Sequence, residues 1–296
     1  MFSFDGIWVP MVTPFRQGEV DHPALRRLVQ QLAGQGVAGF MPCGSTGEAA
    51  MLDEAEQDAV LASVLAAAGD RPVIMGLSGA RPDRVAERAR RLAGQQAVAG
   101  WLITAPAYVK PSQAAIVDYF HRVASATPLP VVAYDVPART GVRIQPATLL
   151  ALADHPQIRA VKDCSADRAA ADAVLADGRL ALLAGNDDEI FDQLARGAAG
   201  VIAASAHLAA GSFVALHRLM QAGSLAEARA LWRRLQPLTA AAFAEPNPAP
   251  VKAGLARQGW LQDELRAPMW PASEATAAAV LAAAAAAAAP PSVNRR

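Results

Sequence analysis

The chain has 296 residues, of which 53% are hydrophobic, and its 27 basic residues balance 27 acidic ones to give zero net charge. This length is enough for one α/β barrel with a sizeable core. Zero net charge provides no basic surface for nucleic acid and no attraction to an acidic membrane, so neither partner is expected.

The cysteine content and the first residues indicate the cellular compartment. Cys43 and Cys164 both lie within apolar runs, which is not typical of a secreted disulfide framework. The first ten residues lack a basic stretch followed by a long apolar core, so no signal peptide is predicted. The alanine-rich tail is better suited to a helix than to a membrane span, because alanine is only weakly hydrophobic. We therefore expect a cytoplasmic protein.

Short apolar runs alternate with longer amphipathic segments along most of the chain. The apolar runs predict strands, and the amphipathic segments predict helices. Asp53 followed by Glu56 is a capping-box pattern that marks one helix start. The predicted strands are residues 7–12, 37–43, 72–77, 99–105, 130–136, 158–165, 180–184 and 200–204. The predicted helices are residues 21–33, 54–68, 82–93, 112–124, 146–153, 167–175 and 189–196, with an eighth ending near residue 221.

Eight strand–helix units predict a particular α/β fold. The strands are continuously apolar, which indicates burial on both faces, as in a parallel sheet covered by helices. Eight such units close into a (β/α)₈ TIM barrel, and the sequence has no glycine-rich nucleotide loop of the kind that an open doubly wound sheet carries. Only helices are predicted after the barrel, so we assign residues 1–222 to it and 223–296 to a C-terminal helical extension. The extension comprises helices at 224–243, 251–258 and 273–289, a proline-rich link at 245–250, and a frayed end at 290–296.

Lys162 is the most informative residue of the predicted barrel. It lies near the carboxyl end of an apolar strand, in a chain with only three lysines. Burial disfavours the ammonium form, so we expect the pKa of Lys162 to be lowered. A neutral amine forms a Schiff base with carbonyl compounds. The alternative is a lysine that reaches solvent from the strand end or pairs with Asp163.

Other polar residues follow the strands at the same edge, where barrel enzymes bind their substrates. Each also has a structural interpretation: the hydroxyls can cap a turn, the tyrosines can simply reach solvent, and the arginine can pair with a carboxylate of the protein. The segment after the seventh strand can be an ordinary helix cap. Together they put an amine, two phenols, two hydroxyls and a guanidinium on one rim. These residues are Ser45 and Thr46 after the second strand, Tyr108 after the fourth, Tyr134 and Arg139 at the fifth, Lys162 on the sixth, and residues 185–188 after the seventh.

The sequence resembles the dihydrodipicolinate synthase/N-acetylneuraminate lyase family of class I aldolases. The segments that carry the resemblance are GSTGE, YDVPARTG, the strand-six lysine, AGNDD, GVIAA and EPNPAPVK, between about residues 6 and 270. The resemblance implies a barrel with a helical extension, usually assembled as a homotetramer (a dimer of dimers). It also implies that pyruvate condenses with aspartate semialdehyde to 4-hydroxy-tetrahydrodipicolinate in lysine and diaminopimelate synthesis, without metal or cofactor.

The resemblance assigns roles to individual residues. It implies that Lys162 forms the imine with pyruvate and that Tyr134 moves protons during this step. Ser45 and Thr46 would hold the pyruvate carboxylate, and Ser45 would continue the proton relay. Tyr108 would complete the relay in a neighbouring subunit, and Arg139 would bind the aldehyde's carboxylate. Gly185 and Ile202 would line the pyruvate pocket.

Three positions depart from the usual family pattern and leave the substrate open. Ser45 stands where threonine is more frequent, Asp135 replaces asparagine, and Cys164 follows the lysine pair in place of alanine. Two alternatives therefore remain. One is a pyruvate-dependent aldolase that acts on a sugar acid or an aromatic aldehyde, and the other is a catalytically silent barrel that serves as a binding protein.

Overall fold

The computed structural model describes residues 3–288, so the frayed end predicted for residues 290–296 lies outside the described residues. Eight parallel strands of this part of the chain form one sheet in the order β4-β1-β10-β9-β8-β7-β6-β5. A parallel bridge between Phe40 and Val73 joins the first strand of this order to the last. The sheet therefore closes into the predicted TIM barrel.

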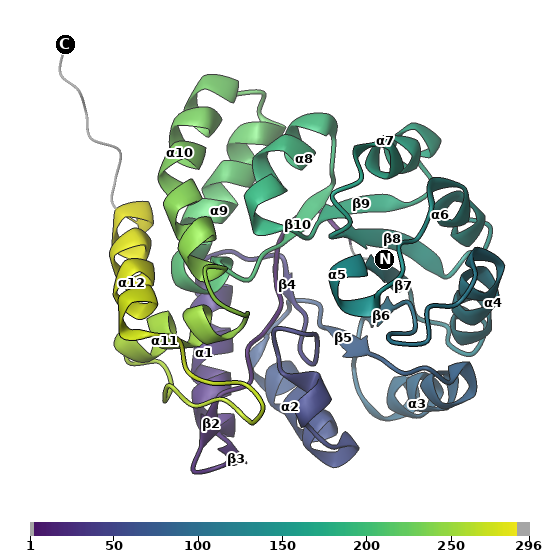
Figure 1. The fold of residues 1–296 in the computed structure, drawn as a ribbon, viewed down its shortest axis with the longest axis horizontal. Helices are drawn as coiled ribbons and strands as arrows, with labels where there is room; N and C mark the ends of the chain where they lie inside the picture. Colours follow the sequence, from purple (N-terminus) through teal and green to yellow (C-terminus); the bar gives the residue numbers. More distant parts are fainter. Residues whose placement is uncertain (1–2, 289–296) are drawn as a thin grey trace.

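The strands lie inside a ring of helices, and the last three helices gather beside α1 and α9 (Figure 1). A two-stranded hairpin, β2 and β3, lies outside the barrel. The strands are β1 (Gly6–Val9), β2 (Phe15–Arg16), β3 (Glu19–Val20), β4 (Gly39–Phe40), β5 (Ile74–Leu77), β6 (Gly100–Thr104), β7 (Val131–Asp135), β8 (Ile158–Asp163), β9 (Ala181–Ala184) and β10 (Gly200–Ile202). The helices are α1 (His22–Gly34), α2 (Glu54–Ala67), α3 (Pro82–Gln95), α4 (Gln113–Ala124), α5 (Pro137–Thr140), α6 (Pro146–Leu152), α7 (Arg168–Asp177), α8 (Ile190–Arg196), α9 (Ala206–Gln221), α10 (Leu225–Ala242), α11 (Ala249–Arg257) and α12 (Glu274–Ala288).

The local sequence explains several element boundaries. The predicted capping box is present, because Asp53 accepts from the Glu56 amide and the Glu56 carboxylate accepts from the Asp53 amide. All eight barrel strands are shorter than predicted, and the local sequence explains two of the differences. β1 stops before Pro10, which has no amide hydrogen for the ladder. β4 contains two residues, because Pro42 also lacks this donor and Cys43 adopts a left-handed backbone (φ 57°).

Alternation along the strands divides the apolar residues into two cores. Trp8, Ile74, Leu102 and Val132 belong to a small cluster inside the barrel. A larger cluster fills the space between the strands and the helices, and it extends to α10, α11 and α12. Since successive strand residues point to opposite faces, a shift of one position decides whether a side chain faces the barrel interior or the helices.

The three predicted helices of the extension are present. α10 packs against α9, and α12 packs against α9, α10 and α11. A left-handed turn at Gly223 (φ 71°) separates α9 from α10. Among residues 3–288, no helix is both long and apolar enough to cross a membrane.

Candidate active site

The register of two neighbouring strands brings the predicted nucleophile and the predicted acid–base together. Tyr134 on β7 is the direct partner of Lys162 on β8. Both side chains are buried, with 5% exposure each, and the Lys162 Nζ lies 4.3 Å from the centroid of the Tyr134 ring. The interpretation of Lys162 as a lysine that reaches solvent is therefore wrong.

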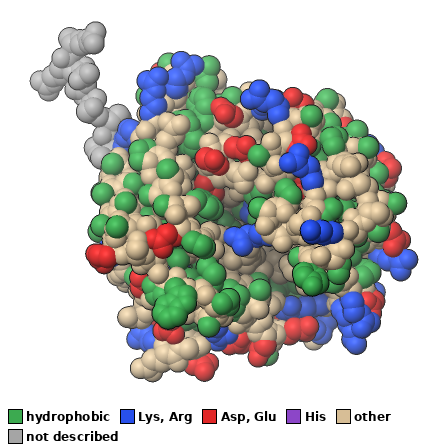
Figure 2. Space-filling view, in the orientation of Figure 1, with side chains coloured by type: hydrophobic (Ala, Val, Ile, Leu, Met, Phe, Trp, Pro, Cys, Tyr) green, Lys and Arg blue, Asp and Glu red, His purple; other side chains and the backbone are tan. Residues whose placement is uncertain are grey.

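A cavity of about 220 Å³ surrounds these two side chains. It opens into a larger hollow of about 610 Å³, which shares Ser45, Tyr134, Val136, Arg139 and Asn247 as lining residues. The face drawn in Figure 2 is hollowed near its centre, with basic side chains at the edge of the hollow. Of the eight predicted site residues, seven line the smaller cavity: Ser45, Thr46, Tyr134, Arg139, Lys162, Gly185 and Ile202.

The electrostatic environment of Lys162 differs from the expectation. Burial is the largest influence and lowers the pKa, but Tyr134, Cys164 and Asp187 favour the cation and leave the pKa of Lys162 above its usual value. The predicted lowering is thus wrong, because it considered burial without the polar partners. Lys162 rests as an ammonium group, and it must lose a proton before it can attack a carbonyl carbon.

The Tyr134 hydroxyl is placed to move this proton. It is hydrogen-bonded to Lys162 and to Ser45. Burial is the main reason why the pKa of Tyr134 is raised, so the phenol is neutral near neutral pH. The Cys164 Sγ lies 3.9 Å from the Tyr134 hydroxyl, and burial raises the pKa of this thiol to about 11. A neutral phenol can accept a proton from Lys162 only while it passes its own proton on, and Ser45 is the neighbour that can receive it.

The turn that carries Ser45 and Thr46 is fixed by the C-terminal segment. The Asn247 side-chain amide donates to Thr46 Oγ1 over 3.0 Å. Glu48, at the end of the turn, has a left-handed backbone (φ 55°) and accepts from Lys252 Nζ over 2.5 Å. Both side chains of this ion pair are fully buried. The pair therefore connects α11 to the loop that forms one wall of the cavity.

Lys252→Met is expected to destabilise the fold by about 3–5 kcal/mol, because the Glu48 carboxylate would remain buried without its cation. Urea unfolding followed by circular dichroism measures this change. The matched double variant Glu48→Gln/Lys252→Met removes both charges and should regain at least half of the lost stability. A loss below 1 kcal/mol in the single variant would show that the pair does not hold the loop.

Arg139 and Tyr108 are more exposed to solvent than the other predicted site residues. Arg139 is exposed on the short helix α5, and it lines both the inner cavity and the outer hollow. Tyr108 is 93% exposed, has a left-handed backbone (φ 71°) and does not line the cavity around Lys162. Its action in a neighbouring subunit stays a prediction.

The backbone at Gly185 passes close to Lys162. A Cβ atom at this position would lie 2.5 Å from the Cys164 sulfur and 2.9 Å from Lys162 Cγ. Neither contact is possible without a shift of the cavity wall, so glycine is required here. Ile202 is buried in the same wall. Their assignment as pocket-lining residues remains a prediction about substrate contact.

Two lining residues received no role from the sequence. The segment with Asp187 was given the structural interpretation of a helix cap, yet Asp187 is buried beside Lys162 and accepts from the Ser205 amide and hydroxyl. Burial raises its pKa although these bonds oppose the shift. Asn247 lies 201 positions from its partner Thr46, and no local pattern indicates such a contact.

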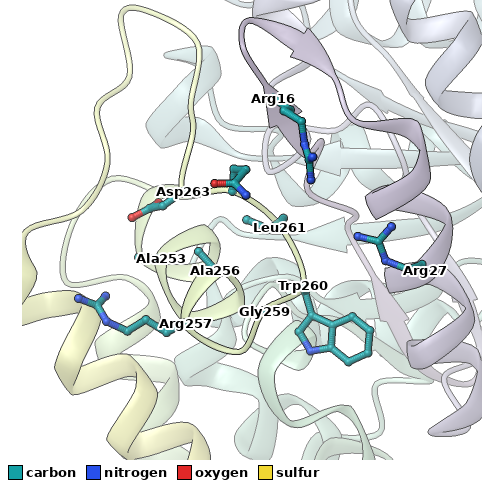
Figure 3. A pocket seen from close by; sticks show the side chains of 10 residues that line it. Arg16, Arg27, Ala253, Ala256, Arg257, Gly259, Trp260, Leu261 and Asp263 are labelled. Carbon is teal, nitrogen blue, oxygen red and sulfur yellow. The ribbon is translucent and has the colours of Figure 1, made fainter.

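Another cavity, of about 450 Å³, lies between α1, the β2–β3 hairpin and the segment after α11 (Figure 3). Arg16, Arg27 and Trp260 are among its lining residues, but it contains none of the predicted site residues. Within residues 3–288, no group of three or more His, Cys, Asp or Glu side chains is placed to hold a metal ion. The cavity around Lys162 is therefore the candidate active site.

Comparison with known proteins supports the resemblance found in the sequence. A sequence model of the Dihydrodipicolinate synthetase family matches residues 3–287. The chain belongs to this family. Similar family members include the 4-hydroxy-tetrahydrodipicolinate synthases of Geotalea daltonii, 38% identical, and Syntrophus aciditrophicus, 35% identical. Each alignment covers 92% of this chain and 94% of the relative.

Solved structures of the family share the fold. A dihydrodipicolinate synthase from Thermotoga maritima superposes with a TM-score of 0.93 at 30% identity, and the match covers 96% of this chain and 99% of that one. A variant described as the first monomeric dihydrodipicolinate synthase superposes with a TM-score of 0.92, also at 30% identity, and the match covers 96% and 97% of the two chains. The family's (β/α)₈ architecture with C-terminal helices is therefore confirmed for this chain.

Proposed function

We propose that the protein condenses pyruvate with aspartate semialdehyde to 4-hydroxy-tetrahydrodipicolinate through an imine on Lys162. The observation that carries the proposal is the position of the Lys162 amine, 4.3 Å from the Tyr134 ring centroid, in a cavity that Ser45 and Thr46 also line. Family membership supports the same activity, because the relatives named above carry this enzyme's name.

The first step joins pyruvate to the enzyme. The Lys162 ammonium loses a proton to solvent through the relay of Tyr134 and Ser45, and its lone pair attacks the ketone carbon. One proton then moves from the nitrogen to the former ketone oxygen and a second reaches this oxygen through the relay, so that it leaves as water and a protonated imine remains. Thr46 is buried in the wall next to Ser45, where its hydroxyl can hold the pyruvate carboxylate. Protons move over one or two hydrogen bonds, which suits general acid–base catalysis.

The second step joins the two substrates. Loss of a proton from the pyruvate methyl group gives an enamine, and the protonated imine serves as the electron sink, so that the reaction needs no cofactor. The enamine carbon attacks the aldehyde carbon, and the aldehyde oxygen takes a proton. Attack of the semialdehyde's amino group on the imine carbon then closes the ring and releases Lys162. Arg139, at the boundary of the two hollows, binds the aldehyde's carboxylate.

The assembly and the domain boundary complete the proposal. We assign the catalytic barrel to residues 1–222 and the extension, which braces the Ser45 loop through Lys252, to residues 223–296. We propose a homotetramer, in which the exposed Tyr108 side chain reaches the site of a neighbouring subunit and completes the relay. Velocity sedimentation tests the assembly.

The aldehyde assay tests the proposed function directly. Purified protein is given one of three substrate sets: pyruvate with aspartate semialdehyde, pyruvate with an aromatic aldehyde, or a sugar acid alone, whose cleavage would release pyruvate. We expect pyruvate consumption with the semialdehyde to exceed the other two reactions by at least about tenfold in kcat/KM. Preference for a sugar acid or an aromatic aldehyde would assign another aldolase activity. Absence of a borohydride-trapped pyruvate adduct would assign a silent barrel.

Arg139→Ala is expected to raise the aldehyde KM by about tenfold or more, because a hydrogen bond to a charged group contributes about 1.5–3 kcal/mol. The pyruvate KM should change less than threefold, since Lys162, Ser45 and Thr46, which are assigned to pyruvate, are unchanged. Steady-state kinetics with each substrate varied in turn separates the two effects. Equal increases in both constants would contradict the role of Arg139 as the receptor of the aldehyde's carboxylate.

The raised pKa of Lys162 predicts the pH dependence of pyruvate capture. A group that rests protonated loses its proton more readily as the pH rises, so the rate of imine formation should rise about tenfold per pH unit between pH 6 and 8. Rapid quenching with borohydride at saturating pyruvate, followed by mass spectrometry, measures this rate. A rate that is constant over this range would indicate a lowered pKa instead.

A further inference from the structure

Two carboxylates face each other on the outer side of the barrel, directly behind the catalytic pair. Asp135 and Asp163 are register partners on β7 and β8, one position after Tyr134 and Lys162. They therefore point away from the cavity, toward the helices. Both are buried, with 2% and 4% exposure. Neither residue was assigned a role in the reaction from the sequence.

The two carboxylates differ in how well they are satisfied. Asp163 accepts from the Ser165 amide and hydroxyl on one oxygen and from the Gln193 side-chain amide on the other. Asp135 Oδ1 accepts only from the Ile144 amide, over 3.2 Å, and Asp135 Oδ2 has no hydrogen-bond partner among the described residues. An ionised carboxylate with an unsatisfied oxygen is costly in a buried position. The surroundings of Asp135 thus suit a neutral carboxylic acid.

The nearby charges agree with this state. Asp163 and Asp167 disfavour ionisation of Asp135, and Arg143 favours it. Arg143 is half exposed and is paired with Asp167 over 2.9 Å, so it compensates little for the buried group. Burial is the dominant influence and raises the pKa of Asp135 to about 7. The carboxyl group therefore changes charge within the physiological range.

The hydrogen bond from the Ile144 amide to the Asp135 side chain closes the loop that carries Arg139. Ile144 lies nine positions after Asp135, and α5 with Arg139 lies between them. Inside this loop, the Thr140 hydroxyl contacts the carbonyl oxygens of Val136 and Val142 over 3.2 and 2.9 Å. The loop is consequently a small rigid unit whose far end is tied to β7 by the Asp135 side chain.

We propose that Asp135 is a positioning residue: as a neutral carboxylic acid it anchors the loop that places Arg139, and its ionisation loosens the aldehyde pocket while the pyruvate pocket stays intact. Ionised Asp135, opposite Asp163, is stabilised most by hydration. Water reaches it when residues 136–144 move outward. Lys162, Tyr134 and Ser45 lie outside residues 136–144, so the groups that form the imine keep their contacts with one another. This inference rests on the proposed use of Arg139 to bind the aldehyde.

Three variants separate charge, hydrogen bonding and general pH effects. Asp135→Asn keeps an acceptor for the Ile144 amide and cannot ionise, whereas Asp135→Ala removes the acceptor. Asp118→Asn is the matched control. Asp118 is an exposed carboxylate on α4 that pairs with Arg122 over 2.7 Å, and it is not one of the groups that shift the pKa of Asp135. The aldehyde KM and the rate of pyruvate trapping are measured for each protein at pH 6 and pH 8.

The neutral fraction of an acid with a pKa near 7 falls about tenfold between pH 6 and pH 8, and apparent affinity falls with the competent fraction. We therefore expect the ratio of the aldehyde KM at pH 8 to that at pH 6 to be about five- to tenfold larger in the parent and in Asp118→Asn than in Asp135→Asn. The substrate and Lys162 titrate in the same way in all of these proteins, so their contributions cancel when the ratios of the proteins are compared. Asp135→Ala should have a raised aldehyde KM already at pH 6, with unchanged pyruvate trapping.

Equal pH ratios in the parent and Asp135→Asn would overturn the proposal, as would a parallel loss of pyruvate trapping in Asp135→Ala. Urea midpoints give a second measurement that requires no catalysis. Because the folded pKa of Asp135 is raised, the parent should lose more stability than Asp135→Asn as the pH rises from about 4 to 7. If this difference appears while no protein traps pyruvate, the proposed function fails and the charge assignment of Asp135 stands.

Discussion

Lys162→Arg is expected to abolish the covalent capture of pyruvate while the barrel remains folded. Arginine keeps the positive charge beside Tyr134 and Asp187, but it cannot supply a neutral amine for attack on a carbonyl carbon. Borohydride treatment in the presence of pyruvate, followed by peptide mapping, should place the adduct on Lys162 in the parent and show none in the variant. Turnover should fall below detection.

The other two lysines provide the controls for this experiment. Lys110 is exposed in the loop after β6, and Lys110→Arg should trap pyruvate at the parental rate. Lys252 is fully buried against Glu48 and should not be labelled in any of the proteins. The circular dichroism spectrum verifies the fold of each variant. A pyruvate adduct that persists in Lys162→Arg would place the chemistry on another amine and reject the mechanism.

Tyr134→Phe is expected to reduce turnover by about 10²–10⁴-fold, the usual contribution of one acid–base group. The variant keeps the ring under the Lys162 amine and loses only the hydroxyl that connects Lys162 with Ser45. Pyruvate binding should change little, because phenylalanine fills the same volume. Pre-steady-state trapping should place the loss in imine formation, and steady-state kinetics should give the same factor.

Tyr119→Phe is the matched control for the hydroxyl. The Tyr119 hydroxyl donates to the Gly79 carbonyl oxygen over 2.9 Å, and it lines neither hollow around the candidate site. This variant should retain parental turnover and lose about 1 kcal/mol of stability with the lost hydrogen bond. Turnover of Tyr134→Phe within threefold of the parent would exclude Tyr134 as the proton shuttle.

Most of the site was predictable because residues at the carboxyl ends of the barrel strands lie close together in space. Lys162, Tyr134 and Arg139 each lie at or just after the carboxyl end of an apolar strand, and these ends share one rim. Period-two alternation then places Tyr134 and Lys162 inside the barrel and Asp135 and Asp163 outside. Any sequence that preserves these strands and their register preserves this arrangement.

The contacts of the C-terminal segment were not predictable in the same way. Asn247 reaches Thr46, and Lys252 reaches Glu48, across about 200 positions of the chain. No periodic pattern links such residues, because their proximity depends on how α10 and α11 pack against the barrel. The motif that contains them indicated the family, but it did not indicate that it braces the Ser45 loop.

The sequence by itself determined the barrel and the strand that carries Lys162. These features follow from the alternation of apolar runs with amphipathic segments, which each segment expresses through its own residues. The charge states of Lys162 and Asp135 were decided only by the tertiary structure. A pKa depends on burial and on all nearby charges and hydrogen bonds, and the groups that supply them come from separate strands and loops. Burial alone suggested a neutral lysine, but the assembled site surrounds it with Tyr134, Cys164 and Asp187 and keeps it charged.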